Sequence, residues 1–150
     1  MSQETLILEC PRCGARNRVL MSRRKDAVCG RCKTSLAFPI GPIAVTDSTF
    51  EEEVLRSPIP VVVEFWTPTC GACRQVAPVI QALARELAGK VVFATMDASR
   101  NMATALRFRV QGVPTFLFFR SGLLLDTMVG AASKEAILYR VQRLIGIGAA

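Results

Sequence analysis

The stretch that decides the fold, EFWTPTCGACRQVAP at residues 64–78, holds two cysteines three positions apart. The residues that lead into it, 59–66, are mostly β-branched or aromatic, which predicts a strand buried on both faces. After the first cysteine, apolar residues recur at helical spacing to about Leu87, and we expect Pro78 to kink this helix. The cysteine pair therefore lies where a buried strand gives way to a helix.

Three uses are open to the pair Cys70 and Cys73: a metal clip, a structural crosslink or a redox couple. The chain has no histidine to complete a metal site with them, and a disulfide across two residues closes too small a loop to stabilise a fold much. A redox couple remains. The start of a helix favours a thiolate at Cys70, whereas Cys73 is expected to be more buried. We therefore expect Cys70 to attack a substrate disulfide and Cys73 to resolve the mixed disulfide.

Cys73 must lose a proton before it can attack, and Glu64 is the candidate acceptor. Glu64 lies six residues before Cys70 in the apolar strand. A carboxyl buried there has a raised pKa, as proton transfer near neutral pH requires. The alternative is that Glu64 ends the strand and faces solvent.

Four more cysteines form two Cys-x-x-Cys pairs near the start of the chain, with fifteen residues between the pairs. This spacing is typical of a zinc ribbon, in which each pair supplies two thiolates to one structural Zn²⁺ ion. The metal ligands are expected to be Cys10, Cys13, Cys29 and Cys32. Gly14 and Gly30 lie where the pairs need tight turns. The alternatives are four free thiols on a disordered arm and a regulatory disulfide switch, which zinc release on oxidation would make compatible with the metal.

Prolines and a glycine crowd into residues 37–45, which predicts a linker. We therefore place the zinc-ribbon domain in residues 1–40 and a second domain in residues 41–150. The second domain shows the predicted order β-α-β-α-β-α-β-β-α, with a capping box of Ser48 and Glu51 at its first helix. This order indicates an α/β fold with a central mixed sheet and helices on both faces.

The net charge of +7 is concentrated in the first forty residues, where eight basic residues face three acidic ones. Such a surplus invites a nucleic-acid hypothesis. A four-thiolate zinc centre, with a charge of about −2, lowers this surplus of positive charge. Phe38 is the one aromatic residue of the segment, so the segment offers few side chains on which a nucleic-acid base could stack. We expect a solvated basic face and no nucleic-acid partner.

The chain begins without a signal-peptide core, and none of its apolar runs is long enough to span a membrane. Six cysteines in a cytoplasmic protein favour metal binding and catalysis over a disulfide framework. We expect a cytoplasmic protein, a monomer, with no membrane association.

Several stretches carry a family resemblance. VVEFWTPTCGACRQVAP, residues 62–78, resembles the active-site strand, loop and helix of thioredoxins. VQGVPTFLFF, residues 110–119, resembles the segment that holds their cis-proline, and residues 128–145 resemble their last strand, Gly-Ala turn and final helix. The likeness covers about residues 43–146. With the four cysteines in front, the chain resembles the zinc-containing bacterial thioredoxin-2 type.

The resemblance implies roles for single residues. Cys70 is the nucleophile, Cys73 the resolving thiol, Pro114 the cis-proline and Glu64 the stand-in for the family's buried aspartate. The substrate groove is expected to include Trp66, Thr69, Gly71, Ala72, Val113, Gly130 and Ala131. Three positions depart from the family's pattern, because Ala72 replaces a proline, Thr69 a tryptophan and Thr95 a lysine.

The resemblance thus implies a thiol-disulfide oxidoreductase that reduces disulfide-containing proteins and is recharged by an NADPH-dependent thioredoxin reductase. The residues between the two cysteines tune thiolate stability, so a more oxidising disulfide isomerase is one alternative. The other is a zinc-ribbon binding module or a chaperone-like module in which the redox couple plays a minor part.

Overall fold

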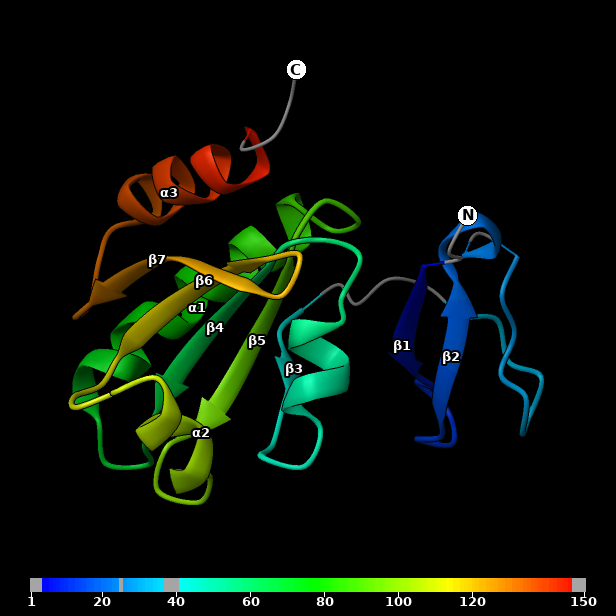
Figure 1. The fold of residues 1–150 in the computed structure, drawn as a ribbon, viewed down its shortest axis with the longest axis horizontal. Helices are drawn as coiled ribbons and strands as arrows, with labels where there is room; N and C mark the ends of the chain where they lie inside the picture. Colours follow the sequence, from blue (N-terminus) through cyan, green and yellow to red (C-terminus); the bar gives the residue numbers. More distant parts are fainter. Residues whose placement is uncertain (1–3, 25, 37–40, 147–150) are drawn as a thin grey trace.

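The structure is a computed structural model that describes residues 4–24, 26–36 and 41–146. Figure 1 shows a small N-terminal ribbon beside a larger sheet flanked by helices. The elements, in chain order, are β1 (Thr5–Glu9), β2 (Arg16–Leu20), the 3₁₀ turn η1 (Met21–Arg23), β3 (Ile43–Ala44), the π-helical turn η2 (Glu51–Leu55), β4 (Val61–Trp66), α1 (Gly71–Glu86), β5 (Val92–Asp97), α2 (Met102–Arg107), β6 (Thr115–Arg120), β7 (Leu123–Val129) and α3 (Lys134–Gly146). A search of the described helices finds none long and apolar enough to cross a membrane.

The larger sheet has the strand order β3-β5-β4-β6-β7. The first three strands run parallel, β6 pairs antiparallel with β4, and β7 pairs antiparallel with β6. Ser121 and Gly122 join the last two strands with φ angles of 52° and 78°, as a two-residue type I′ hairpin turn requires. The predicted mixed sheet with a closing hairpin is confirmed.

Strand β4, at the centre of the sheet, sends alternate side chains to opposite faces. Val61, Val63 and Phe65 join the core that η2 and α2 cover. Val62 joins the core on the other face, which α1 and α3 cover. Glu64 shares the face of Val62, so its side chain lies on the α1 side of the sheet.

The first helix of this domain differs from the prediction. The capping box of Ser48 and Glu51 is wrong, because the N–H of Thr46 donates to Thr49 Oγ1 at 3.0 Å, while Ser48 Oγ lies 3.0 Å from the Thr46 hydroxyl. Thr49 Oγ1, and not Ser48 Oγ, therefore accepts the backbone N–H at the start of the turn. The π-helical turn η2 follows, and its end is closed by the N–H of Arg56, which donates to the carbonyl of Glu51 at 2.9 Å.

The N-terminal ribbon is a two-stranded antiparallel sheet with a small core of its own. Strand β1 pairs with β2 from Thr5 opposite Leu20 to Glu9 opposite Arg16. The buried side chains of this core are Leu6, Leu8, Cys10, Val19, Cys29 and Leu36. Two of the six are cysteines of the predicted metal site, so the core of the ribbon and the cysteine cluster are continuous.

Ion pairs join the ribbon to the larger domain. In Figure 1 the ribbon lies beside β3 and η2. Arg18 contacts Glu52 of η2 at 2.5 Å, and Arg16 lies 3.6 Å from Glu52 and 3.5 Å from Glu53. The hydrogen bond from Arg18 lowers the pKa of the Glu52 carboxyl. Part of the basic surplus of the ribbon is thus used within the chain.

The predicted boundary between residues 40 and 41 adjoins residues 37–40, which lie outside the described residues, as do residues 147–150. The division into residues 1–40 and 41–150 therefore stays a prediction. Of the predicted linker, residues 37–40 lie outside the described residues, and Ile43–Ala44 form β3.

Candidate functional site

The paired cysteines lie where β4 ends and α1 begins. Cys70 is the N-cap of α1, and its Sγ accepts a hydrogen bond from the N–H of Cys73 at 3.0 Å. The two residues are joined by a disulfide, with their Cα atoms 5.2 Å apart. Cys70 is half-buried, whereas Cys73 is 5% exposed. The first cysteine is the accessible one, and the helix N-terminus directs an N–H group at its sulfur.

Glu64 is buried in β4, two residues before the strand ends at Trp66. The ladder of the sheet places it opposite Thr95 on β5 and opposite Phe116 on β6. Its residue surface is 5% exposed, which contradicts the alternative of a solvent-facing strand end. Desolvation by burial raises the pKa of the Glu64 carboxyl to about 7.

A pocket of about 490 Å³ opens beside the disulfide on the α1 side of the sheet. Its lining residues are Glu64, Trp66, Thr67, Pro68, Cys73, Arg74, Ala77 and Thr95. The resolving cysteine and the buried carboxyl therefore share one cavity. Proton transfer needs hydrogen-bond reach, directly or through one water, and this shared cavity is the space in which such a path would run.

Pro114 and the neighbouring groove residues form a second group. The Val113–Pro114 peptide bond is cis. The N–H of Gly130 donates to the carbonyl of Pro114 at 2.8 Å, which brings the end of β7 against this loop. Val113 and Gly130 are half-buried and Ala131 is exposed. None of these three lines the pocket beside Cys73, so the predicted groove and that pocket are separate features.

Comparisons with known proteins agree with this arrangement. The family model described as Thioredoxin matches residues 41–143. The chain belongs to the thioredoxin family. It is 42% identical over 94 residues to Thioredoxin 1 of Synechococcus elongatus, which covers 63% of this chain and 88% of that protein. It is 32% identical over 144 residues to Thioredoxin M4, chloroplastic, of Arabidopsis thaliana, which covers 96% of this chain and 74% of that protein. With Thioredoxin of Allochromatium vinosum the identity is 43% over 95 residues, covering 63% of this chain and 89% of that protein.

Membership of the thioredoxin family makes this chain a thiol-disulfide oxidoreductase, and the predicted enzyme class is confirmed. The Cys70–Cys73 disulfide at the start of α1 corresponds to that activity. The predicted thioredoxin fold is likewise confirmed by the match and by the sheet order.

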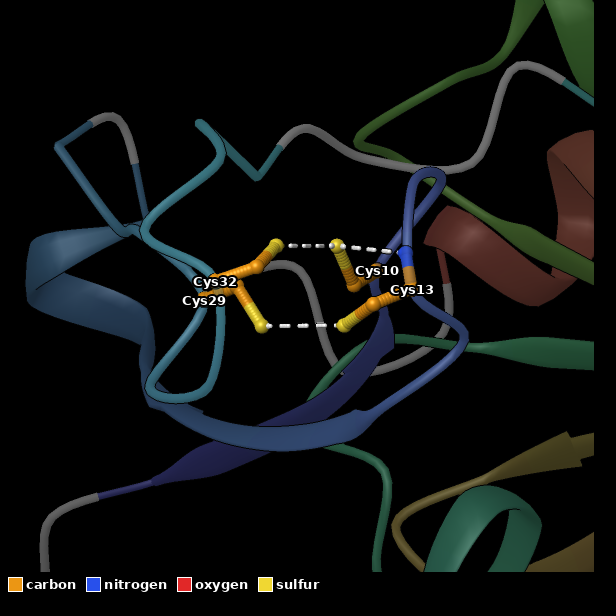
Figure 2. A group of neighbouring side chains, drawn as sticks. All are labelled: Cys10, Cys13, Cys29 and Cys32. Carbon is orange, nitrogen blue, oxygen red and sulfur yellow. Dashed lines mark hydrogen bonds between the residues drawn. The ribbon is translucent and has the colours of Figure 1, made fainter.

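The four ribbon cysteines of this chain converge on one point. Figure 2 shows Cys10 and Cys13 facing Cys29 and Cys32 across a small gap. The Sγ atoms of Cys10 and Cys32 lie 3.5 Å apart, those of Cys13 and Cys29 lie 3.6 Å apart, and all four fall within 4.8 Å of one another. Tetrahedral coordination at a zinc–sulfur distance of about 2.3 Å separates ligand sulfurs by about 3.8 Å. The cluster therefore fits one tetrahedral metal ion.

The two cysteine knuckles repeat one backbone pattern. In the first, the N–H of Gly14 donates to the carbonyl of Cys10 at 3.0 Å, and in the second the N–H of Lys33 donates to the carbonyl of Cys29 at 2.9 Å. Gly14 has a φ of +77° and Lys33 a φ of +65°. Gly30 lies within the turn that the second of these hydrogen bonds closes, as expected, and the left-handed residue of that knuckle is Lys33.

Backbone N–H groups also point at the first sulfur of each knuckle. The N–H of Arg12 donates to Cys10 Sγ at 3.4 Å, and the N–H of Arg31 donates to Cys29 Sγ at 3.3 Å. Hydrogen bonding, chiefly from the backbone N–H of Cys32, lowers the pKa of the Cys29 thiol to about 6. Such donors stabilise thiolates, which are the form that binds metal.

Sequence reasoning missed part of the pocket wall. Arg74 and Ala77 lie on the first two turns of α1, and Thr67 lies in the loop before it. Ala77 follows Cys73 by four positions, so helical spacing alone could have placed both on one face.

Proposed function

We propose that this protein is a protein-disulfide reductase that uses Cys70 as nucleophile and Cys73 as resolving thiol. The Cys70 thiolate attacks one sulfur of a substrate disulfide, and the other substrate sulfur leaves as a thiolate. Cys73, once deprotonated, attacks Cys70 Sγ and displaces the second substrate sulfur. The substrate gains two electrons, and the protein is left with the Cys70–Cys73 disulfide.

The asymmetry of the two cysteines supports these roles. Cys70 is the half-buried N-cap, and its sulfur accepts an N–H hydrogen bond at the positive end of a sixteen-residue helix. Those features favour a thiolate at the residue that a substrate can reach. Cys73 is 5% exposed, so it is accessible to Cys70 and poorly accessible to a bulky substrate. This observation carries the proposal.

Glu64 takes the proton of Cys73 in this proposal. A carboxyl with a pKa of about 7 can both accept and return a proton near neutral pH. The carboxyl borders the same pocket as Cys73. In the described part of the chain no side chain forms a hydrogen bond or an ion pair with Glu64, and desolvation is the cause of its pKa shift, so the carboxyl has no competing partner there.

Zinc is the metal that we propose for the four ribbon cysteines. Four thiolates in tetrahedral arrangement favour Zn²⁺, and a closed four-sulfur shell leaves no open position for catalysis. The ion supplies folding free energy when bound, because the ribbon core is small. Cys10, Cys13, Cys29 and Cys32 would hold it.

The partners in this proposal are disulfide-containing proteins and an NADPH-dependent thioredoxin reductase that restores the dithiol. Cis-Pro114, with Val113 and Gly130 beside it, would form one wall of the substrate groove. Trp66, Thr69, Gly71, Ala72 and Ala131 would complete the groove. A cytoplasmic location is part of the proposal, since a dithiol and four zinc thiolates persist in a reducing compartment.

The test is insulin reduction with NADPH and a bacterial thioredoxin reductase, using the wild type, Cys70→Ser and Cys73→Ser. We expect the wild type to reduce insulin catalytically and both serine variants to lose this activity. Cys73→Ser should accumulate a mixed disulfide through Cys70, and Cys70→Ser should form none. Thr127→Ser, on the exposed face of β7, is the matched control and should retain full activity. Insulin reduction that survives Cys70→Ser would refute the proposal and favour a binding or chaperone-like module.

A further inference from the structure

The pocket beside Cys73 has the size of a small-molecule site. Its volume of about 490 Å³ lies within the range of pockets that bury small ligands, about 300 to 1,000 Å³. Trp66 and Pro68 supply apolar walls, Ala77 lines the helix side, and the methyl-bearing side chain of Thr95 lines the strand side. A small apolar body can therefore be accommodated next to the redox couple.

One charged group of the pocket lacks a partner. Glu64 is 95% buried and lines the cavity. Within residues 4–24, 26–36 and 41–146 no cation or hydrogen-bond donor is paired with it, and desolvation is the cause of its raised pKa. The guanidinium of Arg74, the cation on the pocket wall, donates instead to the carbonyl of Pro68 at 3.1 Å. An unpaired carboxyl in a water-accessible apolar cavity favours a ligand that brings its own cationic donor.

The sheet register explains why this space is open. Thr95 lies directly opposite Glu64 in the β4–β5 ladder and on the same face. Its side chain is too short to fill the cavity or to place a cation on the carboxyl. The helix side is equally open, because Ala77 presents a single methyl group to the pocket. Small side chains on both sides of Glu64 create the cavity.

We propose that the pocket lined by Glu64, Trp66 and Ala77 binds a small apolar primary amine, with the ammonium group paired to the Glu64 carboxylate and the apolar body against Trp66. A carboxylate ligand is disfavoured, since it would meet Glu64 as a like charge.

Occupancy has a consequence for catalysis that rests on the proposed role of Glu64. A carboxylate held in an ion pair with an ammonium is a weaker base and is no longer free to take the Cys73 proton. The bound amine would therefore slow the resolving step and leave the first attack by Cys70 unchanged. Amine binding itself needs no such role, so it can be tested in the oxidised protein without turnover.

The experiment titrates benzylamine and its neutral analogue benzyl alcohol into the zinc-loaded, oxidised full chain at pH 8. Trp66 is the single tryptophan, so its fluorescence reports on the pocket directly, and the amide NMR signals of Ala77 and Thr95 give a second readout. We expect dissociation constants of about 1 to 10 mM for the amine. Benzyl alcohol should bind about tenfold more weakly, because it lacks the charge-assisted hydrogen bond.

Two variants make the proposal falsifiable. Glu64→Gln should weaken benzylamine about tenfold and leave benzyl alcohol unchanged. Thr95→Lys supplies a tethered ammonium opposite Glu64 and should abolish benzylamine binding, whereas Thr127→Lys on β7 adds the same charge far from the pocket and should not. No change in either readout up to about 20 mM amine would overturn the proposal. Equal affinity for the two probes, or benzylamine binding that survives Glu64→Gln, would overturn it as well.

Discussion

The buried carboxyl of Glu64 should make the stability of the oxidised protein depend on pH in a specific direction. Its folded-state pKa of about 7 lies above the ordinary value of 4.5. Below pH 4.5 both the folded and the unfolded chain hold the proton, so stability is at its fullest. Between the two pKa values the unfolded chain releases the proton first, and stability falls as pH rises. The loss is complete once the pH passes the folded pKa.

The size of this effect follows from the shift. One pKa unit corresponds to about 1.4 kcal/mol, so the shift from 4.5 to about 7 corresponds to a loss of about 3 kcal/mol. That figure is an upper value, because the pocket lets water reach the carboxyl. Glu64→Gln replaces the carboxyl by a neutral amide of similar shape and removes the pH-dependent cost.

Urea denaturation followed by far-UV circular dichroism, with the disulfide intact, measures the prediction. The free energy of unfolding of Glu64→Gln should match the wild type near pH 4 and exceed it by up to about 3 kcal/mol at pH 8. Glu135→Gln removes an exposed carboxyl at the start of α3; it is the control and should not reproduce the rise of up to about 3 kcal/mol between pH 4 and pH 8. A difference that stays constant from pH 4 to pH 8, or a variant less stable than the wild type at pH 8, would refute the reasoning.

Three further perturbations have expected outcomes. Arg109 has a φ of +56° at the C′ position of α2, so Arg109→Gly should raise the free energy of unfolding by about 1 kcal/mol in urea titrations; a loss of stability would contradict the strain argument. Cys29→Ser should release the metal, measured by inductively coupled plasma mass spectrometry, and expose the ribbon to trypsin while insulin reduction continues; a protease-resistant, metal-free ribbon would contradict it. Glu52→Gln should weaken the contact between the ribbon and η2, with faster tryptic cleavage after Arg16 and Arg18 than in the Glu135→Gln control, and the contrast should shrink in high salt; equal cleavage rates at low salt would contradict it.

The sequence predicted correctly those features whose residues form a strong pattern along a short stretch of chain. The continuous run of apolar, mostly β-branched residues at 59–66 predicted a buried strand with Glu64 inside it, and the strand-to-helix transition placed Cys70 at a helix start. The two Cys-x-x-Cys pairs predicted the four-sulfur cluster, because their spacing constrains how the hairpin can close.

The local predictions differed from the structure where more than one neighbouring residue could take the same role in a turn. Residue 33 takes a left-handed backbone conformation although it is a lysine. Its N–H donates to the carbonyl of Cys29, and this hydrogen bond closes the knuckle. The predicted cap at Ser48 failed because its hydroxyl pairs with that of Thr46, while Thr49 Oγ1 accepts the Thr46 N–H.

Contacts between segments far apart in the sequence could not be predicted from any local sequence pattern. The ion pairs from Arg16 and Arg18 to Glu52 depend on how the ribbon meets η2. The pocket beside Cys73 depends on small residues, Ala77 and Thr95, that come together from α1 and β5. Neither set of residues forms a pattern along the chain.

The central claim is that Cys70 and Cys73 work as a reductant, and their reduction potential tests it most directly. The zinc-loaded protein is equilibrated against defined glutathione or dithiothreitol buffers, and the dithiol fraction is read by thiol alkylation. We predict a potential near about −270 mV, as is typical of thioredoxin. A potential between about −200 and −180 mV would place the couple with disulfide isomerases and contradict the account.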